Sequence, residues 1–269
     1  LVFVIMLMFY IRITRYYEDK HRKERRDKIS GYFSEYLKKR EVIDIRQLPP
    51  DVLRFKDVLP VVENFDRTFN DPIWQASKMK IFKEYLYPLA IKHLHSHIWH
   101  RRQLSLRVLA LSPENLVEVE SVLHLLNDPK YLVRIYAAAC LIKSKKDSLI
   151  LPVLQRMCKE TPMARYPYRD LLLKSDDKTF KVLEEIASVS EDTEVVRICL
   201  DILSSKKSGN LFPIVDKHIH SSDLECRLAA LKLWGALGSK TQREYLEKCL
   251  TEEAWQIRAE AAHILGKQH

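Results

Sequence analysis

A pattern centred on arginine recurs through the last two thirds of the chain and restricts the folds that it can adopt. In each copy an arginine precedes a run of apolar and small residues, as in Val-Arg134-Ile-Tyr-Ala-Ala-Ala-Cys-Leu. The arginines are Arg107, Arg134, Arg169, Arg197, Arg227 and Arg258, separated by 27, 35, 28, 30 and 31 residues. Each interval has room for a turn, a second helix with its own apolar stripe and another turn. The pattern therefore predicts a row of stacked helical hairpins.

This pattern resembles the HEAT repeats, in particular the short bacterial type that also occurs in phycobilin lyases. The resemblance implies an α-solenoid in which Arg134, Arg197, Arg227 and Arg258 occupy equivalent structural positions and bond to acids or carbonyls of adjacent repeats. Asp128 precedes Arg134 by six residues, as in the aspartate and arginine ladder that joins neighbouring HEAT repeats. The copy at Arg169 lacks the alanines and follows a segment with two prolines, so we expect an irregular repeat there.

Composition supports an all-α fold, because 5 glycines and 11 prolines in 269 residues are too few for the turns of a sandwich or barrel. We expect an α-solenoid of HEAT-like hairpins behind an N-terminal transmembrane and juxtamembrane helix. The five cysteines form no Cys-x-x-Cys pair, so we predict reduced core thiols. The expected segments are a transmembrane end at 1–11, a basic juxtamembrane helix at 12–40, a helical cap at 41–95 and HEAT-like repeats at 96–269.

The first eleven residues carry no charge and resemble half of a membrane span. Because the chain opens on Leu rather than Met, we expect residues upstream to complete that span. A signal sequence and a buried core helix are the alternatives. The basic residues that follow are interpreted as the membrane flank, which predicts a single-pass protein of the inner (plasma) membrane with its C-terminal body in the cytoplasm. These flanking residues are Arg12, Arg15, Arg22, Lys23, Arg25 and Arg26.

Two regions are candidates for protein interaction. The first is the aromatic stripe Tyr32, Phe33 and Tyr36 of the juxtamembrane helix, which either the solenoid itself or a neighbouring membrane protein must cover. The second is the face formed by His93, His97, His100 and Arg101, whose histidines have the i, i+4, i+7 spacing of one helix. A metal site on these histidines is the alternative, but the run contains no carboxylate ligand. We predict no metal and no cofactor.

The sequence contains no nucleophile elbow, phosphate-binding glycine loop or His-Glu-x-x-His motif, and no His-Glu pair of the kind that deoxyhypusine hydroxylases use. Residues 1–40 hold 11 of the 45 Lys and Arg residues but only 5 of the 36 acids. The rest of the chain is nearly neutral, which disfavours nucleic-acid binding. We therefore predict no catalysis and no small-molecule substrate.

The expected function is that of a membrane-anchored cytosolic scaffold or accessory subunit, with another protein, itself membrane-bound, as partner. The resemblance implies a membrane enzyme complex such as a polysaccharide-synthesising glycosyltransferase. The alternatives are a HEAT-type enzyme similar to the bilin lyases and a nucleic-acid-binding solenoid, either one tethered to the membrane.

Overall fold

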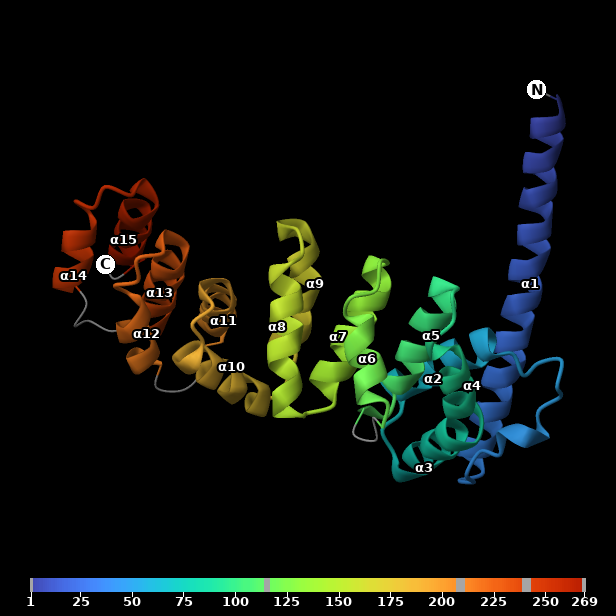
Figure 1. Ribbon diagram of the computed structural model, residues 1–269. Helices are drawn as coiled ribbons and strands as arrows, with labels where there is room; N and C mark the ends of the chain where they lie inside the picture. The colour runs from blue at the N-terminus through green and yellow to red at the C-terminus, as the bar shows by residue number, and fades with distance from the viewer. Residues whose placement is uncertain (1, 114–116, 207–210, 239–242, 268–269) are drawn as a thin grey trace. The chain divides into compact units, whose positions relative to one another are not determined.

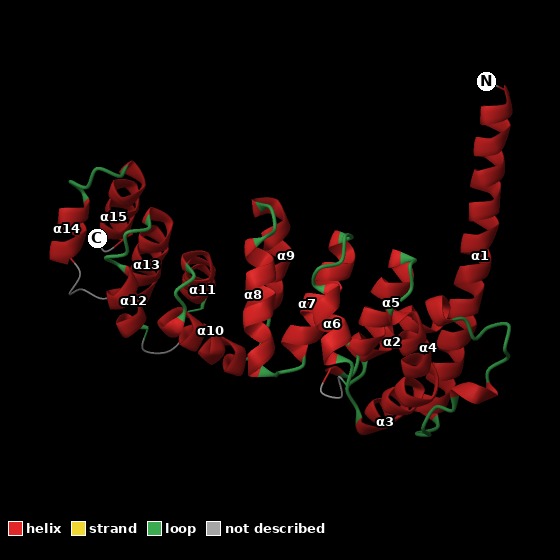
Figure 2. Cartoon of the chain, in the orientation of Figure 1, coloured by secondary structure: helices red, strands yellow, loops and turns green. Residues whose placement is uncertain are grey.

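The computed structural model describes residues 2–113, 117–206, 211–238 and 243–267, and all regular structure in these ranges is helical (Figures 1 and 2). The chain divides into two compact units, Leu1–Leu116 and Val117–His269, called unit 1 and unit 2 below. The all-α prediction is confirmed. Each unit has its own set of helices.

The described part of unit 1, residues 2–113, contains five α-helices, a 3-10 turn at Ile45–Gln47 and a π-helical turn at Phe82–Leu86. The π-helical turn directly precedes Pro88, whose ring nitrogen has no hydrogen to donate to the carbonyl four residues earlier. The helices are α1 (Val2–Lys38), α2 (Phe55–Thr68), α3 (Pro72–Ile81), α4 (Tyr87–Leu94) and α5 (Trp99–Leu109).

The core of unit 1 is built around a large aromatic cluster. Phe33 of α1, Phe65 of α2 and Trp74 of α3 are buried, and their ring centroids lie 5.5–6.1 Å apart. Asp71 fixes the start of α3, because its side chain accepts a hydrogen bond from the Trp74 amide at 2.9 Å. The C-terminal half of α1 is thus part of a folded core.

The predicted transmembrane helix and membrane location are wrong, because no helix in the described ranges is long and apolar enough to cross a membrane. Helix α1 has the length, but charged residues recur along it from Arg12 onwards. Its uncharged part is therefore much shorter than the roughly 20 residues that a span needs.

Unit 2 consists of short helices joined by tight turns, with a 3-10 turn at Asp147–Leu149. Its helices are α6 (Val119–Leu125), α7 (Tyr131–Lys143), α8 (Ile150–Cys158), α9 (Pro162–Leu173), α10 (Asp177–Val189), α11 (Thr193–Ser205), α12 (Phe212–His218), α13 (Leu224–Leu237), α14 (Arg243–Cys249) and α15 (Trp255–Lys267).

The helices of unit 2 form two rows. Helices α7, α9, α11, α13 and α15 each contact the next and form the odd-helix row, while α8, α10 and α12 contact one another in the same order. Small residues permit this approach: a Cβ atom added to Gly235 of α13 would lie 2.6 Å from Cγ1 of Ile264 in α15. This arrangement is consistent with an α-solenoid.

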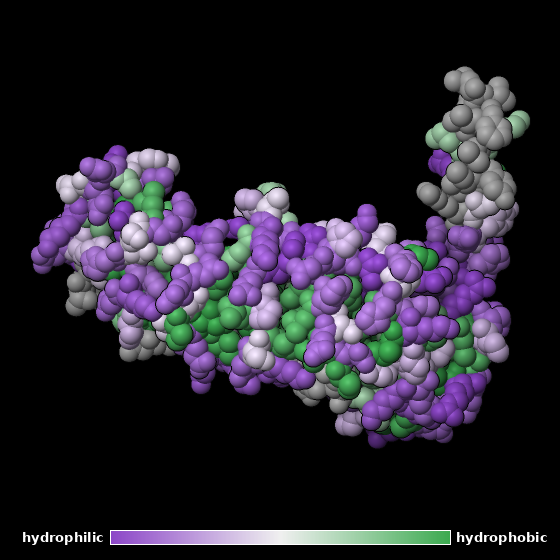
Figure 3. All heavy atoms as spheres, in the orientation of Figure 1, coloured by the Kyte–Doolittle hydropathy of each residue, from purple (hydrophilic) through white to green (hydrophobic). Residues whose placement is uncertain are grey.

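Polar side chains dominate the face of the molecule that Figure 3 shows. On the face drawn in Figure 3, hydrophilic side chains cover most of the described surface and hydrophobic side chains show between them in smaller areas. Burial of apolar side chains therefore leaves a largely hydrophilic surface on this face.

Candidate functional site

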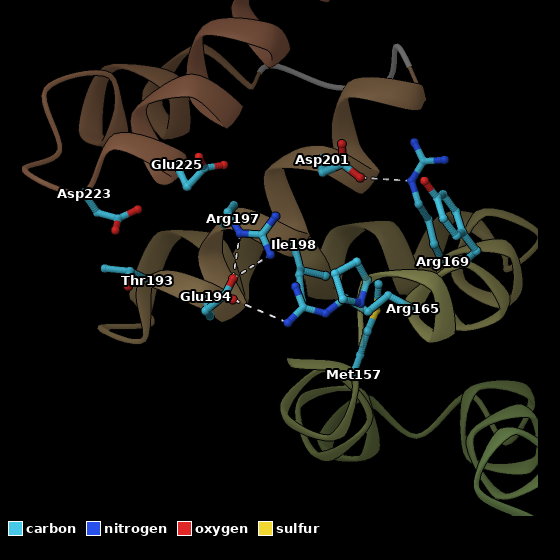
Figure 4. Close-up of a pocket in the computed structure, with 12 residues that line it drawn as sticks. Met157, Arg165, Arg169, Thr193, Glu194, Arg197, Ile198, Asp201, Asp223 and Glu225 are labelled. Carbon is cyan, nitrogen blue, oxygen red and sulfur yellow. Dashed lines mark hydrogen bonds and ion pairs between the residues drawn. The ribbon is translucent and has the colours of Figure 1, made fainter. Parts of the chain in front are cut away.

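A groove lies on the odd-helix row, where the first turns of α9, α11 and α13 face one another (Figure 4). Its volume is about 540 Å³. Asp192 and Asp223 cap α11 and α13 through side-chain hydrogen bonds from backbone amides, which fixes where each helix begins. The lining residues are Met157, Pro162, Arg165, Tyr166, Arg169, Thr193, Glu194, Arg197, Ile198, Asp201, Asp223 and Glu225.

Ion pairs join neighbouring helices along the groove. Arg165 of α9 donates to the backbone carbonyls of Cys158 and Glu160, at 2.7 and 3.0 Å, and lies 3.5 Å from the Glu194 carboxylate. Arg197 contacts the same carboxylate at 2.6 Å. Burial alone would raise the pKa of Glu194, but Arg197 and then Arg165 lower it overall. Glu194 is therefore a carboxylate shared between two helices.

A second ion pair, between Arg169 and Asp201, also joins α9 to α11. Arg169 Nε donates to Asp201 Oδ2 of α11 at 3.0 Å, and its Nη2 donates to the Ser205 hydroxyl at 2.7 Å. These bonds hold the guanidinium across the gap between α9 and α11. The three groove arginines are thus oriented by the protein's own acceptors.

Two carboxylates of the groove have no ion pair of this kind. Asp223 and Glu225 stand at the start of α13, and neither forms a salt bridge with any residue that the structure describes. One oxygen of Asp223 accepts the hydrogen bond from the Cys226 amide at 2.7 Å. The charge of Glu225 acts on Arg197 from beyond ion-pair distance. Unpaired negative charge therefore gathers at the α13 side.

The α9 side of the groove carries exposed apolar surface beside Arg165 and Arg169. Tyr166 is 62% exposed and Met163, one turn away, is 78% exposed. Tyr166 and Arg169 also line a second hollow of about 460 Å³, to which Ile135 of α7 contributes. The two hollows therefore adjoin at Tyr166 and extend across α7, α9 and α11.

The repeat arginines lie on four helices of the odd-helix row. Arg134 Nη1 donates to the carbonyls of Asp128 and Pro129, at 2.9 and 3.3 Å, and Arg258 Nη1 donates to those of Glu252 and Glu253, both at 2.8 Å. The acceptors are six and five residues earlier in both cases. Arg134 thus bonds to the backbone carbonyl of Asp128. The aspartate and arginine ladder of the HEAT resemblance was expected to join neighbouring repeats instead.

Arg134 also forms a largely buried ion pair in unit 2. Its Nε and Nη2 donate to the two oxygens of Glu160, at 2.6 and 2.9 Å, and Glu160 further accepts from Arg156 and Tyr168. Burial opposes the charged form of Glu160, yet Arg134 and Arg156 lower its pKa overall. This carboxylate connects α7 and α9 through the turn after α8.

The other two repeat arginines make different contacts. Arg197 pairs with Glu194 of its own helix, as described above. Arg227 approaches Glu252 at 3.8 Å, and its buried Nε has no hydrogen-bond partner among the described residues. The four arginines therefore share a row but not one set of bonds.

The aromatic stripe predicted on residues 32–36 faces the interior of unit 1. Phe33 is fully buried in the aromatic cluster. Tyr32 donates to the Asp44 carbonyl at 2.8 Å and Tyr36 donates to Gln47 Oε1 at 2.5 Å. The protein itself covers this stripe, which is the core alternative left open by the sequence.

The basic residues interpreted as a membrane flank include three that point inward. Arg22, Arg25 and Arg26 surround the fully buried carboxylate of Asp57 in α2, with Arg25 Nε 2.7 Å from Oδ2. Arg12 and Lys23 are exposed, and the side chain of Arg15 lies outside the described set. The arginine cluster thus has a structural partner 32 residues away from Arg25.

The three histidines do not share a helix, so the prediction of one helix through residues 93–100 is wrong. His93 lies near the end of α4, His97 lies in the turn, and His100 and Arg101 lie in the first turn of α5. His93 packs near the Phe55 ring, and burial, Arg101 and Lys92 lower its pKa. Across the described residues, no group of three or more His, Cys, Asp or Glu is placed to hold a metal ion.

Sequence reasoning missed the groove. Its aromatic residue, Tyr166, lies in the irregular copy of the repeat, and the two prolines of that copy, Pro162 and Pro167, are both within α9. The departure of this copy from the pattern was the available signal. Tyr166 precedes Arg169 by three residues, as the exposed Trp255 precedes Arg258, so the sequence alone did not set this aromatic side chain apart.

No family model matches the chain, and no curated protein matches it. Among solved structures, one engineered protein is similar at 18% identity and a TM-score of 0.34, over 66% of this chain and 94% of its own. A second engineered protein has 15% identity and a TM-score of 0.35, over 83% and 76%. Human deoxyhypusine hydroxylase has 10% identity and a TM-score of 0.32, over 93% and 98%. At such TM-scores these similarities carry no argument about fold or function.

Proposed function

We propose that this chain is a non-catalytic helical-repeat protein that binds another protein through the groove on α9, α11 and α13. The observation that carries the proposal is the combination in one groove of an exposed aromatic side chain, Tyr166, with charged residues already oriented by ion pairs. Exposed aromatic residues ringed by polar groups are typical of protein interfaces. Preorganised charges lower the entropic cost of binding.

The HEAT type of repeat is part of the same proposal. Its support is the repeated bonding of Arg134 and Arg258 to the carbonyls five and six residues earlier. In both copies the arginine satisfies acceptors in the turn that precedes its own helix. A turn held in this way sets the angle between successive hairpins, and stacked hairpins present a long surface for another protein.

The proposal is tested by affinity capture from cell extract, followed by identification of the captured proteins by mass spectrometry. The variant Met163→Ala/Tyr166→Ala, called the groove variant, removes Tyr166 from the groove lining together with the exposed Met163 one turn away. Both side chains are exposed, so the variant is expected to fold. The matched control is Leu151→Ala/Val189→Ala, which removes exposed apolar side chains from α8 and α10. We expect one captured protein to be lost with the groove variant and retained with the control. If the unaltered chain, the groove variant and the control variant capture the same proteins equally, the proposal is contradicted.

A further inference from the structure

The groove contains more carboxylates than arginines, and only some of the carboxylates form ion pairs. Three arginines face four carboxylates, those of Glu194, Asp201, Asp223 and Glu225. All three arginines are bound to Glu194 or Asp201. The three arginines and their two carboxylate partners carry one net positive charge, and Asp223 and Glu225 carry two negative charges, so the groove has an excess of one negative charge on its α13 side.

The position of this charge is set by the fold. Asp223 is the N-cap of α13 and Glu225 is in its first turn, so both carboxylates are held on one wall of the groove. Figure 4 shows them on the far side of Arg197 from Arg169 and Asp201. An anionic ligand would meet uncompensated carboxylates here, whereas one cationic side chain would neutralise the groove.

The α9 wall of the groove offers an apolar contact through Tyr166. Tyr166 presents an exposed ring that lines both hollows, and the buried side chains of Met157 and Ile198 also line the groove. A polypeptide in extended form rises about 3.3 Å per residue and turns alternate side chains to opposite faces. Such a segment places an apolar side chain and a cationic side chain at separate points of one surface.

We propose that the groove binds a segment of a partner protein that carries a lysine or arginine, with the cationic group at Asp223 and Glu225 and an apolar side chain at Tyr166. This inference rests on the proposed function and adds to it the chemistry of the partner. Attraction between the cation and the two carboxylates is screened by salt, so the affinity falls as ionic strength rises.

The test is fluorescence anisotropy with the full chain and a short labelled peptide, Leu-Ala-Lys-Ala-Leu, whose lysine and leucines lie on one face when the peptide is extended. Two further peptides replace the lysine by norleucine, which keeps the stem without the charge, or by glutamate. We expect the lysine peptide to bind about threefold to tenfold more tightly than the norleucine peptide. The glutamate peptide is expected to bind most weakly.

The protein variant for this test is Asp223→Asn/Glu225→Gln, since asparagine retains the N-cap of α13. It should reduce the affinity for the lysine peptide about threefold to tenfold and leave that for the norleucine peptide unchanged. The matched control is Glu244→Gln/Glu247→Gln on α14, which removes the same charge from exposed side chains of unit 2. The control should keep the affinity within about a factor of two.

The inference is overturned if the three peptides bind alike, if the lysine peptide does not bind, or if the control variant loses as much affinity as the groove variant. If the three peptides bind alike or the lysine peptide does not bind, the capture experiment with Met163→Ala/Tyr166→Ala still tests the proposed function. Loss of the captured protein there, with no preference for lysine, would separate failure of the inference from failure of the proposed function.

Discussion

The buried carboxylate of Asp57 is predicted to hold α1 against α2, and its replacement by asparagine tests this directly. Asp57 is fully buried, and three guanidinium groups of α1 surround it. Arg25 makes a hydrogen bond of 2.7 Å, while the Nε atoms of Arg22 and Arg26 lie 3.9 and 3.7 Å from Oδ1 without a hydrogen bond. Asparagine has the same size but no charge, so the variant leaves Arg25 and Arg26 without an acidic partner among the described residues, while Arg22 keeps its ion pair with Asp19.

The magnitude follows from the burial of the site. Removing one partner of a buried ion pair costs about 3–5 kcal/mol, because the remaining charge has no compensation. The arginine side chains are 16–38% exposed, so water reduces the penalty and we expect about 3 kcal/mol. Hydrogen–deuterium exchange of the α1 and α2 amides measures the loss within unit 1, as protection lower by about a hundredfold.

Asp66→Asn, in the same helix, is the control. Asp66 pairs with Lys78 at a site that is 30% exposed, and an amide can still accept from the Trp74 indole. Its expected cost is below about 1 kcal/mol. Adding Arg25→Gln to Asp57→Asn should restore part of the protection, because it removes a cation that has lost its acidic partner. A cost of Asp57→Asn no greater than that of Asp66→Asn would refute the reasoning.

Three further predictions concern packing, pH and thiol chemistry. Gly235→Ala should destabilise the protein by about 1–3 kcal/mol in urea unfolding, because the new Cβ overlaps Ile264, whereas Gly31→Ala, with nothing within 4 Å, should stabilise it by up to about 1 kcal/mol. The lowered pKa of Glu160 means that its stabilisation is present above pH 4.5, the ordinary glutamate value, and is lost on acidification; Glu160→Gln should flatten the fall in melting temperature below that pH. Burial raises the pKa of Cys158 to about 11, so alkylation of this thiol in the native protein at pH 8 should be roughly tenfold to a hundredfold slower than after unfolding, as peptide mass spectrometry would show.

The helical repeat was predictable because its signal is local. The recurring arginines and small residues place α7, α11, α13 and α15 correctly, since periodicity and close packing both act within a few turns of one helix. The helical hairpin around the histidines was not predictable in this way. Periodicity alone continues one helix through His97, but packing of α4 against α5 requires the chain to turn after Leu94.

The contacts that sequence reasoning misassigned are all non-local. A cluster of arginines beside an apolar run has the same pattern whether it flanks a membrane or surrounds a carboxylate, and Asp57 is 32 residues from Arg25. The aromatic stripe around Phe33 was correctly seen to need cover, although the sequence did not reveal that Phe65 and Trp74 provide it. The groove depends on side chains from three helices that only tertiary packing brings together.

Photo-crosslinking from the groove tests the central claim most directly. Benzoylphenylalanine placed at position 166 projects from the exposed face of α9, and the same group at position 185 of α10 is an exposed control outside the groove. The proposed binding of a partner segment predicts that irradiation links one captured protein to position 166 and not to position 185. Linkage of that protein from position 185 alone, or its capture without linkage at position 166, would contradict the claim that the groove of α9, α11 and α13 is the binding surface.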